Sequence, residues 1–147
     1  MAKTQYWLIK SEPSVYAYAQ LEKDGETEWT GIRNFEARNN LRAMRPGDLC
    51  LYYHSNEDKA VVAVAQVLTE AGPDSTAPGE DWASVRVGPV VALSAPVALA
   101  TVKKTAALKD FPLITRSRLS VTPITAAHFK LILKLGGTAL PKASQPG

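Results

Sequence analysis

Residues 49–53 read Leu-Cys-Leu-Tyr-Tyr, and this stretch decides the class of fold. Every position is apolar or aromatic, so both faces of an extended segment would be buried, which is typical of a central strand. Turn residues precede it at 46–48, and the β-branched run 61–68 follows after a polar loop at 54–60. We therefore expect a β-hairpin whose first strand lies inside a sheet.

Further strands and helices are predicted on both sides of this hairpin. Strands are predicted at residues 5–10, 82–93 and 117–121, with a bulge or an edge at Gly88-Pro89. Helices are predicted at 14–22, 34–44, 103–108 and from residue 123 or 125 to 135. Short strands at irregular spacing, with helices between them, favour an α+β fold built on a compact mixed barrel or a strongly bent sheet.

The length of 147 residues fits one domain, and 46% hydrophobic content is enough for a core. We expect residues 1–140 to form that domain and residues 141–147, which show no periodicity, to be a flexible tail. The segment 72–81 is rich in Pro, Gly and Ser and is predicted to be a long exposed loop.

Several classes of protein are not expected. Apolar runs are interrupted well before the roughly 20 residues that cross a bilayer, and the first residues lead into a strand without a signal peptide, so we expect a cytoplasmic protein. Cys50 has no cysteine partner, and two histidines are too few to complete a structural zinc site. The nucleotide-cofactor and hydrolase-elbow motifs are absent, so no metal or cofactor is expected.

The net charge of +3 is unevenly distributed. Residues 101–147 contain eight Lys and Arg against one Asp, which favours an anionic partner. Along the helix predicted between Asn34 and the turn at Pro46, Arg38, Arg42 and Arg45 repeat at helical spacing beside the core stripe. Such a row is either a set of phosphate contacts or a solvated helix face, and the spacing alone favours the solvated face.

Aromatic and polar residues gather at 7–11, 29–40, 52–56 and 116–120, a mixture that a pocket for a flat heterocycle needs. Stacking on an aromatic ring and hydrogen bonds to the edge of the base would both be available. The candidates are Trp29, Tyr52 and Tyr53 for stacking, Ser11, Asn34, Ser55 and Asn56 for the edge, and Arg33, Arg116 and Arg118 for phosphates. Neighbours in a strand alternate, so either Tyr52 or Tyr53 faces the core, and Asn34 could equally serve as a helix cap.

Several of these segments together resemble one known family, the EVE domain. The resemblance covers residues 5 to about 137 and rests on residues 6–13 (Tyr-Trp-Leu-Ile-Lys-Ser-Glu-Pro), 29–44 (beginning Trp-Thr-Gly-Ile-Arg-Asn), 47–48 (Gly-Asp), 53–56 (Tyr-His-Ser-Asn) and 118–123 (Arg-Leu-Ser-Val-Thr-Pro). Thr30 and Ile32 stand where the commonest form of the motif has Asp and Val, while Trp29 is kept.

The resemblance implies a PUA-like bent β-barrel with peripheral helices and a non-catalytic function. Such domains bind DNA or RNA and accept a flipped, often modified, base in an aromatic-lined pocket, and EVE domains are associated with modified cytosines in DNA. The matching positions imply pocket walls from Trp29 and Tyr53, with a polar lining of Lys10, Ser11, Asn34, His54, Ser55, Asn56 and Arg118. The residues expected to bind the nucleic-acid backbone are Arg33, Arg38, Arg42, Arg45 and Arg116, because the helix with the arginine row lies in the motif beside the pocket.

Two other functions stay open at this point. One is a small enzyme acting on a nucleobase or nucleoside, with His54 as acid or base beside Asn56, although the sequence offers no evident titratable partner for His54. The other is an adaptor that binds proteins and whose pocket is vestigial. The choice between DNA and RNA, the preferred modification and the oligomeric state are not determined by the sequence.

Overall fold

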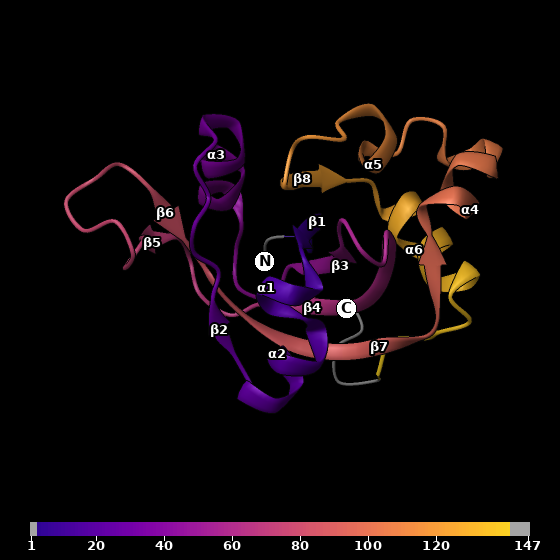
Figure 1. The fold of residues 1–147 in the computed structure, drawn as a ribbon, viewed down its shortest axis with the longest axis horizontal. Coiled ribbons are helices and arrows are strands. Elements are labelled where there is room, and N and C mark those ends of the chain that lie inside the picture. The colour runs from indigo at the N-terminus through magenta and orange to yellow at the C-terminus, as the bar shows by residue number, and fades with distance from the viewer. Residues whose placement is uncertain (1–2, 142–147) are drawn as a thin grey trace.

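The computed structural model describes residues 3–141, so the tail predicted at 141–147 lies, apart from Pro141, outside the described residues. Within them, six strands form one curved mixed sheet in the order β2-β7-β4-β3-β1-β8 (Figure 1). The strands are β1 (Tyr6–Ser11), β2 (Thr27–Glu28), β3 (Leu49–His54), β4 (Ala60–Val67), β7 (Arg86–Ala98) and β8 (Val121–Ile124). A separate small hairpin pairs β5 (Gly72–Pro73) with β6 (Ala83–Ser84).

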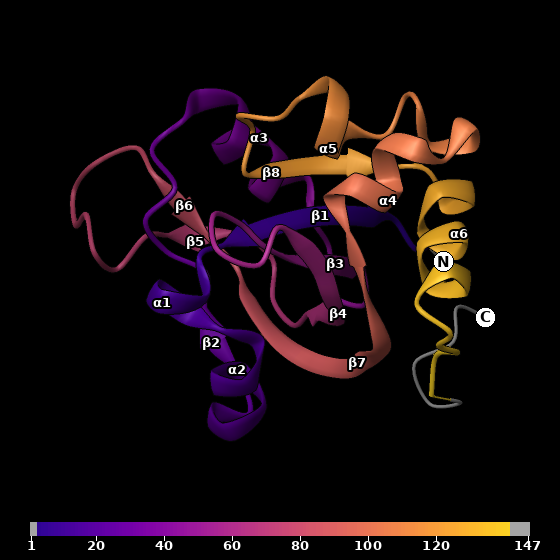
Figure 2. The same cartoon turned by 45° about the vertical axis from the view of Figure 1, so that its right-hand side comes forward.

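The sheet is curled into a half-barrel, which confirms the expected α+β fold with a strongly bent sheet. Strands β1 and β3 are parallel, and the other neighbouring pairs are antiparallel. Strand β7 bends around β3 and β4, as Figures 1 and 2 show. The predicted bulge is confirmed, because the β4–β7 register shifts between Val64↔Val91 and Ala65↔Pro89.

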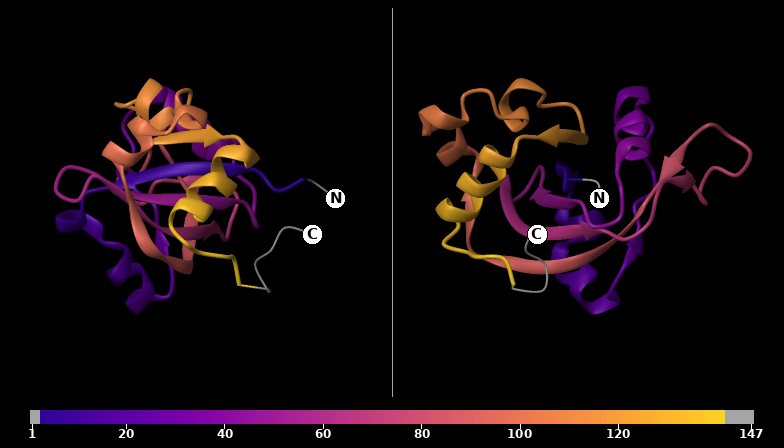
Figure 3. Two further views of the ribbon diagram at one scale, coloured as in Figure 1. Left: turned by 90° about the vertical axis from the view of Figure 1, so that its right-hand side faces the viewer. Right: turned by 180° about the vertical axis from the view of Figure 1, so that it is seen from behind.

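The helices cover the ends and faces of this sheet. They are α1 (Pro13–Tyr16), α2 (Tyr18–Asp24), α3 (Phe35–Ala43), α4 (Leu99–Lys104), the short 3-10 helix η1 (Ala106–Leu108), α5 (Pro112–Thr115) and α6 (Ala126–Leu135). Seen from behind in Figure 3, α4, α5 and α6 gather at one end of the molecule, while α3 and the β5–β6 hairpin stand at the other.

The first two predicted helices differ from the structure at their boundaries. The helix predicted at 14–22 is broken by Ala17, which is extended, and Pro13 rather than Ser14 begins it. Asn34 caps α3 as predicted, its side chain accepting the Ala37 N–H at 2.9 Å, but the helix ends at Ala43. Arg45 therefore lies beyond the helix, and the predicted row of three arginines is reduced to Arg38 and Arg42.

The C-terminal third also departs from the prediction. The strand expected at 117–121 begins only at Val121, because residues 117–120 form a turn and its exit, and the short helix α5 was not predicted. The helix expected at 103–108 is divided into α4 and η1 at Thr105. The last helix starts after Thr125, whose hydroxyl accepts the His128 N–H at 3.0 Å.

The hydrophobic core is divided between the two faces of the sheet. All six residues of β3 are buried, which confirms the prediction of a central strand. Alternation along β3 places Cys50 and Tyr52 in the cluster under α2 and α3, and Leu51 and Tyr53 in the cluster under α4 and α6. Tyr52 can therefore reach only a site on the face covered by α2 and α3, and Tyr53 only a site on the face covered by α4 and α6.

The described residues give no sign of a membrane span or a metal cluster. Their helices lack the length and apolarity that a bilayer crossing requires. Nor do they bring three or more His, Cys, Asp or Glu side chains together in a way that could hold an ion.

Candidate functional site

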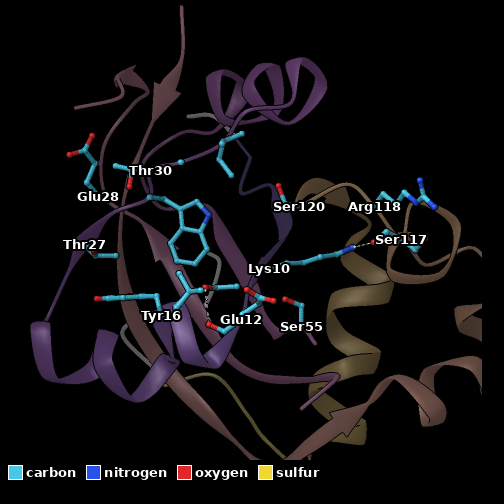
Figure 4. Close-up of a pocket in the computed structure, with 15 residues that line it drawn as sticks. Lys10, Glu12, Tyr16, Thr27, Glu28, Thr30, Ser55, Ser117, Arg118 and Ser120 are labelled. Atoms are coloured by element: carbon cyan, nitrogen blue, oxygen red, sulfur yellow. Dashed lines mark hydrogen bonds between the residues drawn. The ribbon is translucent and has the colours of Figure 1, made fainter. Parts of the chain in front are cut away.

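The main cavity lies where the parallel strands β1 and β3 end. Because the two strands run in the same direction, the chain leaves both at one edge of the sheet, and Ser11 pairs with His54 there. The Lys10 N–H donates to Ser120 O at 3.1 Å and brings the segment before β8 to the same edge. The resulting cavity of about 640 Å³ is lined by residues 10–12, 15–16, 27–32, 55, 117, 118 and 120 (Figure 4).

Trp29 forms the aromatic wall of this cavity, in the place that the sequence predicts. Its residue is 6% exposed, and its ring meets the ring of Tyr52 edge-on at 5.4 Å between centroids and that of Tyr16 at 6.4 Å. The Trp29 N–H donates to Val85 O at 2.8 Å, which fixes the backbone as well. The indole is therefore held rigidly before any ligand arrives.

The second aromatic wall is Tyr16, and the expectation for Tyr53 is corrected. Tyr53 is buried in the core cluster on the opposite face of the sheet and does not line the cavity. Tyr52 is on the correct face but is buried, and its hydroxyl donates to Tyr16 O at 2.6 Å. Tyr52 thus positions Tyr16, for which the sequence predicts only a place in the helix at 14–22.

The polar lining contains Lys10, Ser11, Ser55 and Arg118 as predicted from the motif, and also Glu12, which was not predicted. Lys10 Nζ donates to Ser117 O at 3.0 Å, and burial lowers the pKa of its ammonium group. Figure 4 shows Lys10 reaching toward Ser117 and Glu12 beside Ser55. Both charged groups therefore lie on the same polar side of the cavity.

Asn56 and Asn34 lie outside this lining. The Asn56 amide donates to the Glu12 carboxylate, so Asn56 acts on the cavity through Glu12. Asn34 lies at a second, shallower hollow of about 280 Å³, together with Glu36 and residues 115–119. The two hollows share Ser117 and Arg118, so the surface is continuous from one to the other.

His54 is placed away from the cavity, contrary to the expectation. Its Nε2 accepts the Tyr18 N–H at 3.1 Å, so the ring proton is on Nδ1, which donates to Asp58 at 2.8 Å. Both ring nitrogens are thus used to hold the start of α2 and the β3–β4 turn. Asp58 is the partner that sequence reasoning did not find, and the geometry makes His54 a structural residue.

The predicted backbone-binding arginines mostly carry carboxylate partners. Arg33 pairs with Asp74, Arg38 and Arg42 both pair with Asp81, and Arg116 pairs with Glu36. Arg45 contacts a carboxylate through its main chain, because its backbone N–H donates to Asp48 Oδ2 at 3.0 Å. Arg118 makes no ion pair with any of residues 3–141 and is exposed at the cavity mouth.

The side chain of Asp74 anchors segment 29–33, which forms part of the cavity lining. It is 1% exposed, although the sequence predicts an exposed loop at 72–81. Its carboxylate accepts the Gly31 N–H at 2.9 Å, the Arg33 guanidinium at 3.0 Å and both donors of Thr76. Segment 29–33 is therefore fixed from outside the sheet by a residue far away in sequence.

The family model of the EVE domain matches residues 5–135. The chain belongs to the EVE domain family. Human thymocyte nuclear protein 1 is similar to this EVE domain at 31% identity, over 90% of the chain and 74% of the relative.

The fold is also similar to that of several solved structures. A protein of Agrobacterium tumefaciens is 41% identical, with 94% of this chain and 97% of that chain covered and a TM-score of 0.91. Human thymocyte nuclear protein 1, solved in complex with DNA containing 5-methylcytosine, is 30% identical, with coverage of 92% and 99% and a TM-score of 0.85. The YTH domain of Zygosaccharomyces rouxii MRB1 is 21% identical, with coverage of 94% and 89% and a TM-score of 0.59, which shows a shared fold. The PUA-like architecture expected for the EVE domain is thereby confirmed.

Proposed function

We propose that this EVE domain is a non-catalytic nucleic-acid reader that takes one flipped base into the cavity walled by Trp29 and Tyr16. A modified cytosine in DNA is the favoured ligand. The observation that carries the proposal is the fixed indole of Trp29 on the wall of a polar-lined cavity, at whose mouth lies Arg118, which makes no ion pair within the described part of the chain. The complex of human thymocyte nuclear protein 1 with DNA containing 5-methylcytosine supports this ligand class.

The interactions available in the cavity are of the size needed to offset the extrusion of one base. Extruding a base costs a few kcal/mol, and stacking on an aromatic ring returns about 1–3 kcal/mol per base. Hydrogen bonds from Lys10 and the serine hydroxyls, and a phosphate contact from Arg118, would supply the remainder. A catalytic function is not proposed, because the histidine considered for it has both ring nitrogens bonded to protein groups outside the cavity.

The direct test compares three duplexes that differ at one position opposite an abasic site, where the cost of extruding a base is small. That position carries 5-methylcytosine, cytosine or a second abasic site, the last being the abasic duplex. The abasic duplex is expected to bind about 5- to 150-fold more weakly than the 5-methylcytosine duplex, since it forfeits the stacking energy of one base. Cytosine is expected to bind only about fourfold more weakly, because one buried methyl group is worth about 0.8 kcal/mol. Equal binding of the abasic and methylated duplexes in fluorescence anisotropy would remove the flipped base from the proposal.

The ion pairs of Arg38 and Arg42 with Asp81 lead to a second expectation. Asp81, whose side chain is 77% exposed, holds Arg38 at 2.9 Å and Arg42 at 2.5 Å, and a backbone phosphate would have to replace its carboxylate. Such an exposed ion pair is weak because solvent screens it, so a phosphate can replace the carboxylate at little cost. Asp81→Asn is accordingly expected to raise the affinity for DNA about two- to fivefold.

The matched control is Glu80→Gln, which removes one negative charge from the same loop and is exposed. A specific exchange predicts that Asp81→Asn has the larger effect and that its gain disappears when Arg38 and Arg42 are both changed to Gln. Similar gains from both substitutions, measured across a range of salt concentrations, would show that net charge alone is responsible.

A further inference from the structure

Glu12 presents an oriented hydrogen-bond acceptor to the cavity. The residue follows β1, and the amide of Asn56 donates to its Oε1. Asn56 has a left-handed backbone with a φ of 67°, at the turn between β3 and β4, which places its short side chain against Glu12. The other carboxylate oxygen, Oε2, has no hydrogen-bond partner among residues 3–141. The bond from Asn56 thus holds the carboxylate through Oε1, and Oε2 keeps its capacity to accept a hydrogen bond from a ligand.

Lys10 presents the complementary donor. Its ammonium group donates to Ser117 O at 3.0 Å and lies 3.5 Å from Arg116 O, which ties the end of β1 to the loop before β8. An ammonium group has three N–H donors and no acceptor, so at least one remains for a ligand. Its half-buried position keeps the side chain from sweeping freely through solvent.

The other polar lining groups are engaged, bifunctional or at the mouth, where Arg118, which has only donors, is assigned to a phosphate. Glu28 has a carboxylate too, but its oxygens accept from the Ser75 N–H at 3.0 Å and from the hydroxyls of Ser75 and Ser84 at 2.6 and 2.8 Å. The lining serines can both donate and accept. Among the described residues, Glu12 is thus the lining carboxylate with an open oxygen, and Lys10 is the ammonium that lines the same polar side.

We propose that Glu12 and Lys10 select the base by its hydrogen-bonding edge, Glu12 accepting from an exocyclic amino group and Lys10 donating to a ring carbonyl. This assignment rests on the proposed function of the cavity. Among pyrimidines, cytosine carries an amino group at C4 and a carbonyl at C2, whereas thymine and uracil carry carbonyls at both positions. A carbonyl in the place of the amino group would face the carboxylate of Glu12 and leave both acceptors unpaired. The pocket therefore takes a cytosine and rejects thymine.

The magnitude of this selection follows from the charge on Glu12. A hydrogen bond to a charged group that is lost without replacement weakens binding by about 10- to 100-fold. Burying a methyl group contributes much less, so the edge of the base, rather than its methyl group, dominates the choice between 5-methylcytosine and thymine. These two bases have the same methyl group and nearly the same shape, which makes them a clean pair for the experiment.

The experiment uses two duplexes with 5-methylcytosine or thymine opposite an abasic site, so that the cost of extrusion is similar for both. Wild type is expected to prefer 5-methylcytosine by about 10- to 100-fold. Glu12→Gln replaces the carboxylate with an amide that can donate to a carbonyl, and it is expected to bring the preference close to one. Glu57→Gln makes the same chemical change at an exposed position of the β3–β4 turn outside the cavity lining, and it is expected to keep the wild-type preference.

The outcomes separate this inference from the proposed function. An unchanged preference in a folded Glu12→Gln variant, or a wild type that binds the two bases equally, overturns the role of Glu12 while leaving the reader function intact. Wild type that binds neither base better than a duplex with a second abasic site in that position would instead overturn the proposed function. Circular dichroism of Glu12→Gln verifies folding, which should be unaffected because Glu12 provides no side-chain cap to α1.

Discussion

Replacing Trp29 with leucine is expected to leave a folded protein that binds a flipped base about 5- to 150-fold more weakly than wild type. Leucine fills part of the volume next to Tyr16 and Tyr52 but has no aromatic face on which a base can stack. Titration of a 5-methylcytosine duplex, followed by anisotropy, measures the loss.

Alanine at the same position is expected to have a mixed effect. Trp29 is nearly buried, and truncating a buried tryptophan to alanine costs about 3–5 kcal/mol of the free energy of unfolding. Weak binding by Trp29→Ala alone would therefore not distinguish a lost contact from a loosened core. Trp29→Phe, which keeps a ring, should recover much of the binding that Trp29→Leu loses.

Tyr53→Phe is the control for the corrected wall assignment. Its ring lies in the core cluster on the far face of the sheet, so binding should be the same as in wild type. A folded Trp29→Leu variant with wild-type affinity would contradict the assignment of Trp29 as the stacking wall. A loss of binding in Tyr53→Phe would contradict the placement of Tyr53 on the face away from the cavity.

Replacing Asp74 with asparagine is expected to lower the free energy of unfolding by about 2–4 kcal/mol near neutral pH. The carboxylate accepts four hydrogen bonds and is almost fully buried, and an amide cannot accept all of them. Segment 29–33 loses its outer anchor in this variant, so base binding should weaken together with stability.

The pH dependence of this effect follows from the pKa of Asp74. Burial by itself raises that pKa, but hydrogen bonds from Thr76, Gly31 and Arg33 outweigh burial and hold it at about 2, below the ordinary value. Because the folded-state pKa is depressed, the stabilisation is complete above about pH 4 and is lost as the pH falls toward about 2. Urea unfolding of wild type and Asp74→Asn should thus show a difference that shrinks across this range.

Asp110→Asn is a suitable control, because Asp110 is exposed in the turn before α5. Its substitution should change stability little at any of these pH values. A difference between wild type and Asp74→Asn that stays constant from neutral to acidic pH would mean that the ionised carboxylate is not what stabilises the loop.

The central strand and the α3 cap were predictable because their signals are local. Residues 49–53 lack a polar face, and Asn34 stands directly before a periodic helix, so neither depends on distant partners. The family motif is also contained in short segments, and it led correctly to Trp29 as a lining residue. Period-two alternation likewise showed that Tyr52 and Tyr53 must face opposite sides.

Features that depend on contacts between distant parts of the chain could not be predicted from local sequence patterns. The identity of the pocket face depends on where α1 and β2 pack, so alternation could not choose between Tyr52 and Tyr53. Asp74 is 43 residues from Gly31, and its loop composition resembles that of an exposed segment. The acidic partners of the arginines lie between 39 and 80 residues away in sequence, and a count of positive charges cannot detect them. The cytoplasmic location and the flexible tail stay predictions.

The placement of β1 between β3 and β8 determines when the site can come into existence during synthesis. Strand β1 is made first, yet its two partners lie roughly 40 and more than 100 residues later, and contacts of such separation form slowly. The Lys10 side chain has no carbonyl to hold it until residues 116–117 have emerged from the ribosome. Nascent chains that end before this point contain Trp29 and Tyr16 but lack Ser117, Arg118 and Ser120, so the complete lining is formed late in synthesis.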